Sequence, residues 1–295
     1  MAVAAIFFFL GRIVWENWEQ VREAAFSFRA IPLLLSTLIF VLGYFIQVWA
    51  WYLITLRLGI ALSPGETVAN WFYSQMGKYL PGKIWLLLGR FYLYDSKGKS
   101  KKAITVALYL ETVTLILAAG LVFLLSLLSL KEVRSFPIGI PLAGVILLLL
   151  VSFLFLHPRV LEKIFNRVLA RLKREPFPLP LSYSDVLWVL AVCILSWVVG
   201  GFGFYLFVDS VFTVSPKDVY LLTGALAVSN TAGLLALFAP SGLGVREGVL
   251  VLLLSSIMPS SVAVVLSILT RLWMTFIEIG LIGVVYLIHS LRRRG

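Results

Sequence analysis

Long runs of apolar residues, separated by short polar gaps, dominate the chain. Each run is continuous and lacks the alternation of apolar and polar positions that marks a β-barrel strand. The clear runs cover residues 31–56, 103–129, 138–156, 186–208 and 262–289, and a weaker run covers 1–11. Most approach or exceed the roughly 20 residues with which an α-helix crosses hydrocarbon. The pattern predicts an all-α polytopic membrane protein with about six full spans in one domain over residues 1–295, because backbone in lipid must satisfy its own hydrogen bonds.

Two stretches, 63–94 and 215–258, are too broken to be simple spans. Glycine and proline interrupt them near their centres, at Gly77, Pro81 and Gly82 in the first and at Pro240, Gly242 and Gly244 in the second. Such breaks are tolerated at membrane depth only where protein or a water-filled cavity covers the backbone, so we predict two re-entrant helical hairpins. The segment 219–238 is long enough to cross alone, and if 215–258 spans twice the chain makes eight crossings.

The two broken stretches share a series of features. Each opens with serine, proline and an acidic residue in the first turn, Ser63-Pro64-Gly65-Glu66 and Ser215-Pro216-Lys217-Asp218, as helix starts do. A long span follows each, and Glu111 follows Gly82 by as many residues as Arg271 follows Gly242. We predict two repeats of inverted topology, 31–129 with hairpin 63–94 and 186–289 with hairpin 215–258. Transporters use this architecture to build a site at mid-membrane.

The basic residues indicate how the chain is oriented. The formal net charge is +11, from 25 Lys and Arg against 14 Asp and Glu. The basic residues concentrate in the gaps 57–102 and 159–174 and in the Arg292–Arg294 tail, which the positive-inside rule places in the cytoplasm. We therefore predict a multi-pass plasma-membrane protein with both termini cytoplasmic. Membrane topology accounts for the charge, so no nucleic-acid partner is expected.

The connector between the repeats, 138–182, contains an amphipathic segment at 158–175. Its apolar residues fall on one helical face and its basic residues on the other, as in a helix lying on an anionic leaflet. It is interpreted first as a connector between the halves and alternatively as a helix that recruits lipid head groups.

Signals for catalysis are weak. The single cysteine, Cys193, lies in an apolar run and excludes an internal disulfide. His157 and His289 stand alone at the ends of spans, and no cluster of metal ligands or nucleophile motif is visible. The sequence predicts no metal, no cofactor and no enzymatic activity.

Charged residues inside membrane helices cost about 2.5–3.5 kcal/mol each at the helix centre and are functional candidates by default. Five cations are predicted to bind a lipid head group: Lys78, Lys83, Arg90, Arg246 and Arg271. Three acids are predicted to balance charge or couple an ion: Glu111, Glu247 and Glu278. Glu111 and Arg271, at equivalent depths, could pair across the halves, either as a structural ion pair or as part of a substrate site. Lys78 and Lys83 could instead be cytoplasmic charge, and Arg246 could pair with Glu247 or Glu278.

Two motifs resemble the transmembrane region of lysylphosphatidylglycerol synthases over nearly the whole chain. They are Gly77-Lys78-Tyr79-Leu80-Pro81-Gly82-Lys83-Ile84-Trp85 with Arg90, and Ala239-Pro240-Ser241-Gly242-Leu243-Gly244-Val245-Arg246-Glu247-Gly248. The resemblance implies a lipid flippase in which the Pro81-Gly82 tip and the 242–248 segment form the core of the lipid pathway. In bifunctional members a separate soluble domain transfers the aminoacyl group, and since none follows Arg294, that activity is not expected.

The sequence thus predicts translocation of an anionic lipid, a phospholipid or a polyprenyl-phosphate-linked lipid, between leaflets through a cationic mid-membrane cavity. Membrane lipids, mainly anionic, are the expected partners. Two alternatives remain open: a glycosyltransferase-type membrane enzyme acting on lipid-linked sugars, and a non-transporting anchor for a partner lipid-modifying enzyme. The sequence leaves the lipid, the direction, the driving force and the oligomeric state undetermined.

Overall fold

The computed structural model describes five main stretches of the chain, residues 28–80, 84–128, 156–171, 175–236 and 242–292, together with Arg12, Trp15, Trp18, Glu19, Leu147, Leu150, Phe153, Leu154, Lys173 and Ala239. Within these residues all regular secondary structure is helical. The predicted span 1–11 and most of 138–156 lie outside them. So do Pro81, Gly82, Lys83, Pro240, Arg293 and Arg294.

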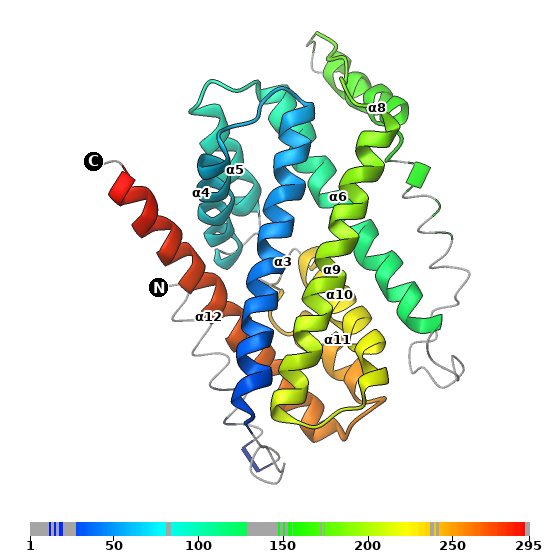
Figure 1. The fold of residues 1–295 in the computed structure, drawn as a ribbon. Coiled ribbons are helices and arrows are strands. Elements are labelled where there is room, and N and C mark those ends of the chain that lie inside the picture. Colours follow the sequence, from blue (N-terminus) through cyan, green and yellow to red (C-terminus); the bar gives the residue numbers. More distant parts are fainter. Residues whose placement is uncertain are drawn as a thin grey trace.

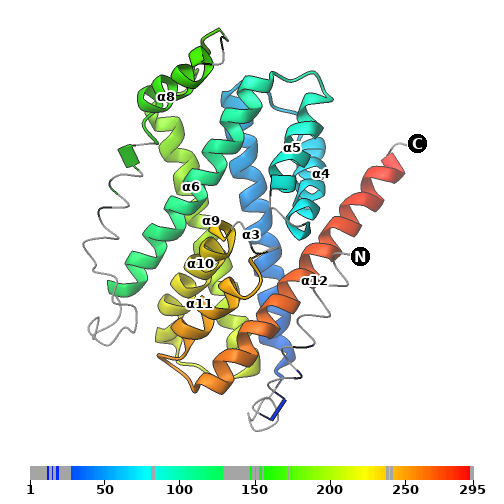
Figure 2. The same ribbon diagram turned by 180° about the vertical axis from the view of Figure 1, so that it is seen from behind.

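Four described helices are long and apolar enough to cross a membrane: α3 (Ala30–Arg57), α6 (Lys101–Leu128), α9 (Tyr183–Val211) and α12 (Ser260–Arg292). They coincide with the predicted runs 31–56, 103–129, 186–208 and 262–289. The all-α membrane class is therefore confirmed for the described part of the chain. The helices cross the length of the molecule, with α3 and α9 side by side at its centre (Figures 1 and 2).

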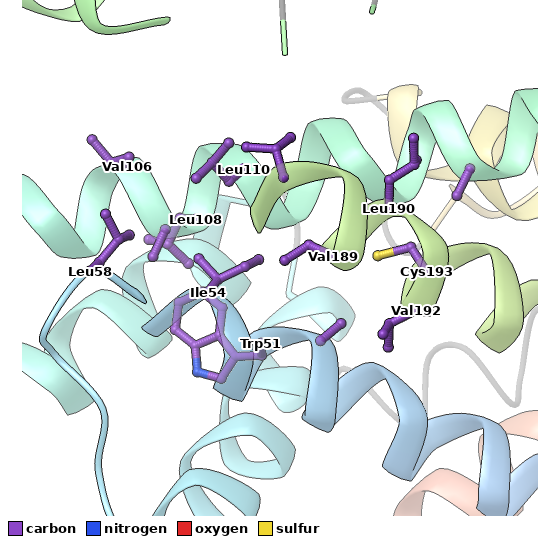
Figure 3. Close-up of a cluster of buried hydrophobic side chains, with 14 of the residues drawn as sticks. Trp51, Ile54, Leu58, Val106, Leu108, Leu110, Val189, Leu190, Val192 and Cys193 are labelled. Atoms are coloured by element: carbon purple, nitrogen blue, oxygen red, sulfur yellow. The ribbon is translucent and has the colours of Figure 1, made fainter. Parts of the chain in front are cut away.

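Small residues let α3 and α9 approach closely. A Cβ added to Gly43 would lie 3.8 Å from the Gly200 backbone, and the Ser36 hydroxyl donates a hydrogen bond to the Gly203 carbonyl at 2.5 Å. Close backbone contact through glycine and serine is how helices associate in lipid, where the hydrophobic effect does not drive them together. Apolar side chains from α3, α6 and α9, among them Ile54, Leu110 and Val189, pack together in the core (Figure 3).

A first pair of short helices follows α3. Helix α4 (Pro64–Gln75) starts where α3 ends, η1 (Met76–Tyr79) turns the chain, and α5 (Ile84–Asp95) returns to the same end (Figure 1). Ser63 caps α4 as its sequence predicts, with its hydroxyl accepting from the Glu66 N–H at 3.4 Å. With 12 residues each, α4 and α5 are about 18 Å long, well short of the roughly 30 Å hydrocarbon core.

A second short pair starts from the opposite end of the molecule. The turn η3 (Pro216–Asp218) leads into α10 (Val219–Leu235), and α11 (Val245–Leu254) runs back toward the start of α12 (Figures 1 and 2). Ser215 caps this start as Ser63 does the first. Helix α10 has 17 residues and α11 has 10, which correspond to about 26 Å and about 15 Å. The chain thus places the tips of two short pairs near one another in the middle of the molecule.

The amphipathic segment forms helix α8 (Pro158–Arg171), which lies at the end of the molecule where α9 begins (Figure 1). Leu161 and Leu169 are buried, whereas Lys163 and Arg167 are exposed. The Phe177 N–H donates to the Asn166 side chain at 2.7 Å and ties the following linker to this helix.

Candidate functional site

A cavity of about 550 Å³ lies between the four long helices and both short pairs. Its lining includes six of the eight charged residues singled out in the sequence: Lys78, Arg90, Glu111, Arg246, Arg271 and Glu278. A seventh, Glu247, contacts Arg271, and Lys83 lies outside the described residues. Residues distant in sequence are thereby gathered around one cavity.

Arg90 of α5 is the most enclosed of these cations, with 1% of the residue exposed. Its Nε donates to the Ser74 hydroxyl at 2.9 Å, and its Nη1 forms an ion pair with Glu111 of α6. The guanidinium also lies over the rings of Trp51 and Trp71, 4.7 and 5.3 Å from their centroids. Trp71 in turn donates to the Glu111 carboxylate at 3.0 Å. The protein itself therefore satisfies the charge of Arg90.

Gly77 sets the position of the first tip. A Cβ on this residue would lie 2.5 Å from the backbone nitrogen of Leu86, closer than real Cβ atoms come. Only glycine therefore lets η1 lie directly against the start of α5. The contact fixes the next two residues, Lys78 and Tyr79, at the cavity wall.

Glu278 of α12 receives the first tip. Its Oε2 pairs with the Lys78 ammonium and accepts from the Tyr79 hydroxyl at 3.2 Å and the Tyr44 hydroxyl of α3 at 3.5 Å. Its Oε1 is buried and has no hydrogen-bond partner in the described part of the chain. Arg271, Thr275 and Glu278 share one face of α12, since residues three and four apart are neighbours on a helix.

Glu247 organises the second tip. One of its carboxylate oxygens accepts from the Gly244 N–H at 2.7 Å at the start of α11, and the other lies 3.4 Å from the Arg271 guanidinium. Gly242 and Gly244 have φ values of +70° and +82°, the left-handed region that favours glycine. A Cβ on Gly242 would also lie 2.6 Å from the Gly233 Cα. Both glycines are therefore required where the chain turns into α11.

Arg246 has a different environment. Lys78, Arg90 and Arg271 each pair with a carboxylate, but no described carboxylate lies within 4.0 Å of Arg246, the limit for an ion pair. Its Nη2 donates to the Met274 sulfur at 2.8 Å. Among the described cations that line the cavity, Arg246 is therefore the one that forms no ion pair with a carboxylate.

The ion pairs differ from those expected from sequence. Glu111 does not pair with Arg271; it pairs with Arg90, and Arg271 pairs with Glu247. Arg246 pairs with neither Glu247 nor Glu278 among the described contacts. The physical reason is proximity: Glu111 and Arg271 are each matched by the short helix packed beside them in their own half, α5 against α6 and α11 against α12, whereas Glu278 of α12 pairs across the halves with Lys78.

Some cavity residues were missed by the sequence reasoning, notably Tyr44, Gln47 and Trp197. Tyr44 and Gln47 are three residues apart in the apolar middle of α3, and this spacing was the available signal. Within the described residues no three His, Cys, Asp or Glu side chains are grouped so that they could hold a metal ion.

Comparison with known proteins gives one informative match. A family model described as "Lysylphosphatidylglycerol synthase TM region" matches residues 1–283, essentially the whole chain. No curated protein and no solved structure gives a significant match.

Proposed function

The chain belongs to the lysylphosphatidylglycerol synthase TM region family, and we propose that it moves an anionic lipid between the two leaflets of the membrane through the cavity at the tips of the short helix pairs. The match confirms the resemblance predicted from the two motifs. Domains of this family are generally of the lipid flippase type, the transporting rather than the catalytic part. Anionic lipid as substrate, phospholipid or polyprenyl-phosphate-linked, is our inference from the cavity.

Charge in the cavity supports this proposal most directly. Among the described residues, four basic and two acidic side chains line it. If Glu247 is counted with its partner Arg271, the cations still exceed the carboxylates by one, and the unmatched cation is Arg246. Arg246 is half-buried and forms no ion pair with a described carboxylate, so part of its hydration is lost, and a lipid phosphate arriving beside it would offset that cost. The three ion pairs formed by Lys78, Arg90 and Arg271 would keep the cavity close to neutral when no lipid is bound.

The lengths and positions of the short helices support re-entrant hairpins in inverted repeats. At about 15 Å, α11 is too short to cross, which argues against the alternative in which 215–258 spans twice. The pairs start from opposite ends of the molecule (Figure 1). In addition, each half buries one ion pair between its second short helix and the next long helix, Arg90 with Glu111 and Glu247 with Arg271, with the signs exchanged.

The distribution of basic residues supports a cytoplasmic location for one end of the molecule. The end of α3, the link from α5 to the start of α6, helix α8 and the end of α12 all lie at this end (Figure 1), and the first three of these segments carry basic residues such as Arg57, Lys97, Lys101 and Lys163. By the positive-inside rule it faces the cytoplasm. The head group would cross through the cavity while the acyl chains stay in lipid.

Transbilayer movement in liposomes tests the proposal. Wild-type protein should move fluorescent phosphatidylglycerol between leaflets, and Arg246→Gln should slow this movement at least tenfold without loss of folded protein. Arg159→Gln, on the exposed face of α8, is the matched control and should behave as wild type. Equal rates for Arg246→Gln and wild type would contradict the proposal. Product formed from a lipid-linked sugar, with no lipid movement, would favour the enzyme alternative.

A further inference from the structure

The ion pair between Lys78 and Glu278 connects parts of the chain that are far apart in sequence. Lys78 lies in η1, the four-residue turn at the first tip, and Glu278 lies on α12, the long helix that follows the second short pair. The other two described ion pairs at the cavity each join a short helix to the long helix that follows it, α5 to α6 and α11 to α12. A change in the charge of Glu278 would therefore act directly on the contact that holds the first tip against α12.

The two oxygens of the Glu278 carboxylate have unequal surroundings. Oε2 pairs with Lys78 and accepts from the hydroxyls of Tyr79 and Tyr44. Oε1 is buried and has no hydrogen-bond partner in the described part of the chain, and only 2% of the residue is exposed. Buried polar atoms in native proteins are nearly always hydrogen-bonded, so an oxygen left in this state indicates that something else binds it. A proton is the one ligand that such an enclosed oxygen can take up without additional space.

Other elements bring mainly cations toward Glu278. Arg246 of α11 and Arg271 of α12 both act electrostatically on the Lys78 ammonium and face the same cavity. The acid of α11, Glu247, is held by Arg271. Helices α4 and α9 also pack against α12, but the residues that they bring to the cavity carry no charge. Lys78 is therefore the cation in direct contact with Glu278, and an anion that draws Lys78 away leaves the carboxylate without its partner.

We propose that Glu278 is a proton-binding site that couples lipid movement to a proton gradient, with one proton carried for each anionic lipid. This inference rests on the proposed function and specifies its driving force. The lipid phosphate at Arg246 draws Lys78 away from Glu278 through a charge-assisted hydrogen bond. The carboxylate then takes a proton from water at Oε1, and the new O–H donates to a phosphate oxygen. When the lipid leaves on the other side, the proton returns to water there and Lys78 pairs with Glu278 again.

The contacts of both residues are compatible with the two states. The Tyr44 and Tyr79 hydroxyls can donate to Oε2 whether or not Oε1 carries a proton, so the carboxyl group stays in place. The Lys78 side chain is 28% exposed, and its ammonium lies over the Tyr79 ring, 5.4 Å from the centroid. It therefore has room to turn toward an anion in the cavity. Because a proton and a singly charged lipid cross together, no net charge crosses the membrane.

Accumulation of lipid under two kinds of gradient tests the proposal. Liposomes carry wild-type protein and phosphatidylglycerol labelled on an acyl chain, and protein-free liposomes correct for movement through the bilayer itself. A pH difference of one unit should concentrate the lipid in the leaflet on the alkaline side by up to about tenfold, because each lipid moves with one proton. An imposed membrane potential without a pH difference should concentrate it in neither leaflet, because no net charge moves.

A neutral variant tests the assignment to Glu278. Glu278→Gln keeps a hydrogen-bonding side chain but cannot exchange a proton, so lipid should move alone, respond to the membrane potential and ignore the pH difference. Glu162→Gln, on α8 and outside the described cavity lining, is the matched control and should behave as wild type. A response of Glu278→Gln to the pH difference equal to that of wild type would overturn the proposal.

Proton uptake by wild-type protein provides a measurement that needs no variant. Short-chain phosphatidylglycerol added to the protein in weakly buffered detergent at neutral pH should cause uptake of about one proton per bound lipid, read with a pH-indicator dye. Binding without proton uptake, or accumulation by wild-type protein under the membrane potential but not under the pH difference, would overturn proton coupling and leave the translocator. Failure of wild-type protein to move the lipid under any gradient would count against the proposed function itself.

Discussion

Arg90 and Arg246 should differ in what they contribute, although both line the same cavity. Arg90 is enclosed by Glu111, Ser74 and two tryptophan rings, so replacing it leaves the Glu111 carboxylate, which is only 14% exposed, without its cation. Removing one partner of a buried ion pair typically costs about 3–5 kcal/mol. We therefore expect Arg90→Met to lower the free energy of unfolding by that amount, while the transport rate of the folded fraction is largely retained.

A double-mutant cycle isolates the pair. Arg90→Met and Glu111→Gln should each strongly lower the free energy of unfolding. The double variant should lose less than the sum of the two single losses, by at least about 2 kcal/mol, because neither charge is then left without its partner. Denaturant titration in mixed micelles, followed by tryptophan fluorescence, gives the free energies. The cycle for Arg57 and Asp185, an ion pair of 3.0 Å with more than half of the arginine side chain exposed, is the control and should show a coupling of about 0–1 kcal/mol.

The result that would refute this reasoning is additivity at Arg90 and Glu111 within about 0.5 kcal/mol. A stable Arg90→Met variant that has lost transport would also refute it, because Arg90 would then be a substrate contact and not part of the scaffold.

Three further predictions concern the first tip and the end of the molecule at which α4 begins. Gly77→Ala should destabilise the protein by about 1–3 kcal/mol, because the new Cβ would lie 2.5 Å from backbone atoms. Gly283→Ala is the control and should not destabilise the protein, because its Cβ would meet no atom of another described helix within 4 Å; thermal melting in detergent compares the two variants. Lys78→Met should leave the Glu278 carboxylate without its cation and slow the movement of anionic lipid in liposomes. Lys163→Met on the exposed face of α8 is the control and should not slow it, and an unchanged rate in Lys78→Met would contradict the prediction. The hydrogen bonds that Lys97 and Ser63 donate to Glu66 lower the pKa of this carboxyl below its usual 4.5. The small stabilisation from these hydrogen bonds is fully present above pH 4.5 and is lost as the pH falls through the lowered pKa. Glu66→Gln should therefore reduce the fall in melting temperature on acidification, and identical acid profiles for the variant and wild type would contradict this prediction.

Much of the fold could be predicted from the sequence because lipid imposes strict conditions. Uninterrupted apolar runs that long can only be spans, and the four described long helices begin and end within a few residues of the predicted limits. The serine, proline and acid at the starts of α4 and η3 signal helix starts through local hydrogen bonds, which do not depend on the rest of the molecule.

The sequence could identify most of the charged residues that line the cavity, but it could not identify which of them form ion pairs. Charge at membrane depth is rare enough that the amino-acid sequence alone identifies Arg90, Arg246, Arg271 and Glu278 as candidates. Which acid meets which cation depends on how α5 and α11 rotate against their neighbours, and equal depth in two repeats carries no information about that rotation. Gln47 was missed because a single amide side chain in an apolar span usually only forms a hydrogen bond to a neighbouring helix.

The central claim is that lipid passes through the cavity, and reversible blocking tests it most directly. Cys193 is the single cysteine and is buried, so a Cys193→Ala background allows one new cysteine at a time. Ile116→Cys places a thiol at the cavity wall, and Leu38→Cys places one on the exposed outer face of α3 as the control. Attaching a bulky methanethiosulfonate group should stop movement of phosphatidylglycerol in the Ile116→Cys protein, and dithiothreitol should restore it, while the Leu38→Cys protein is unaffected by either. Full transport by the labelled Ile116→Cys protein would contradict a route through the cavity.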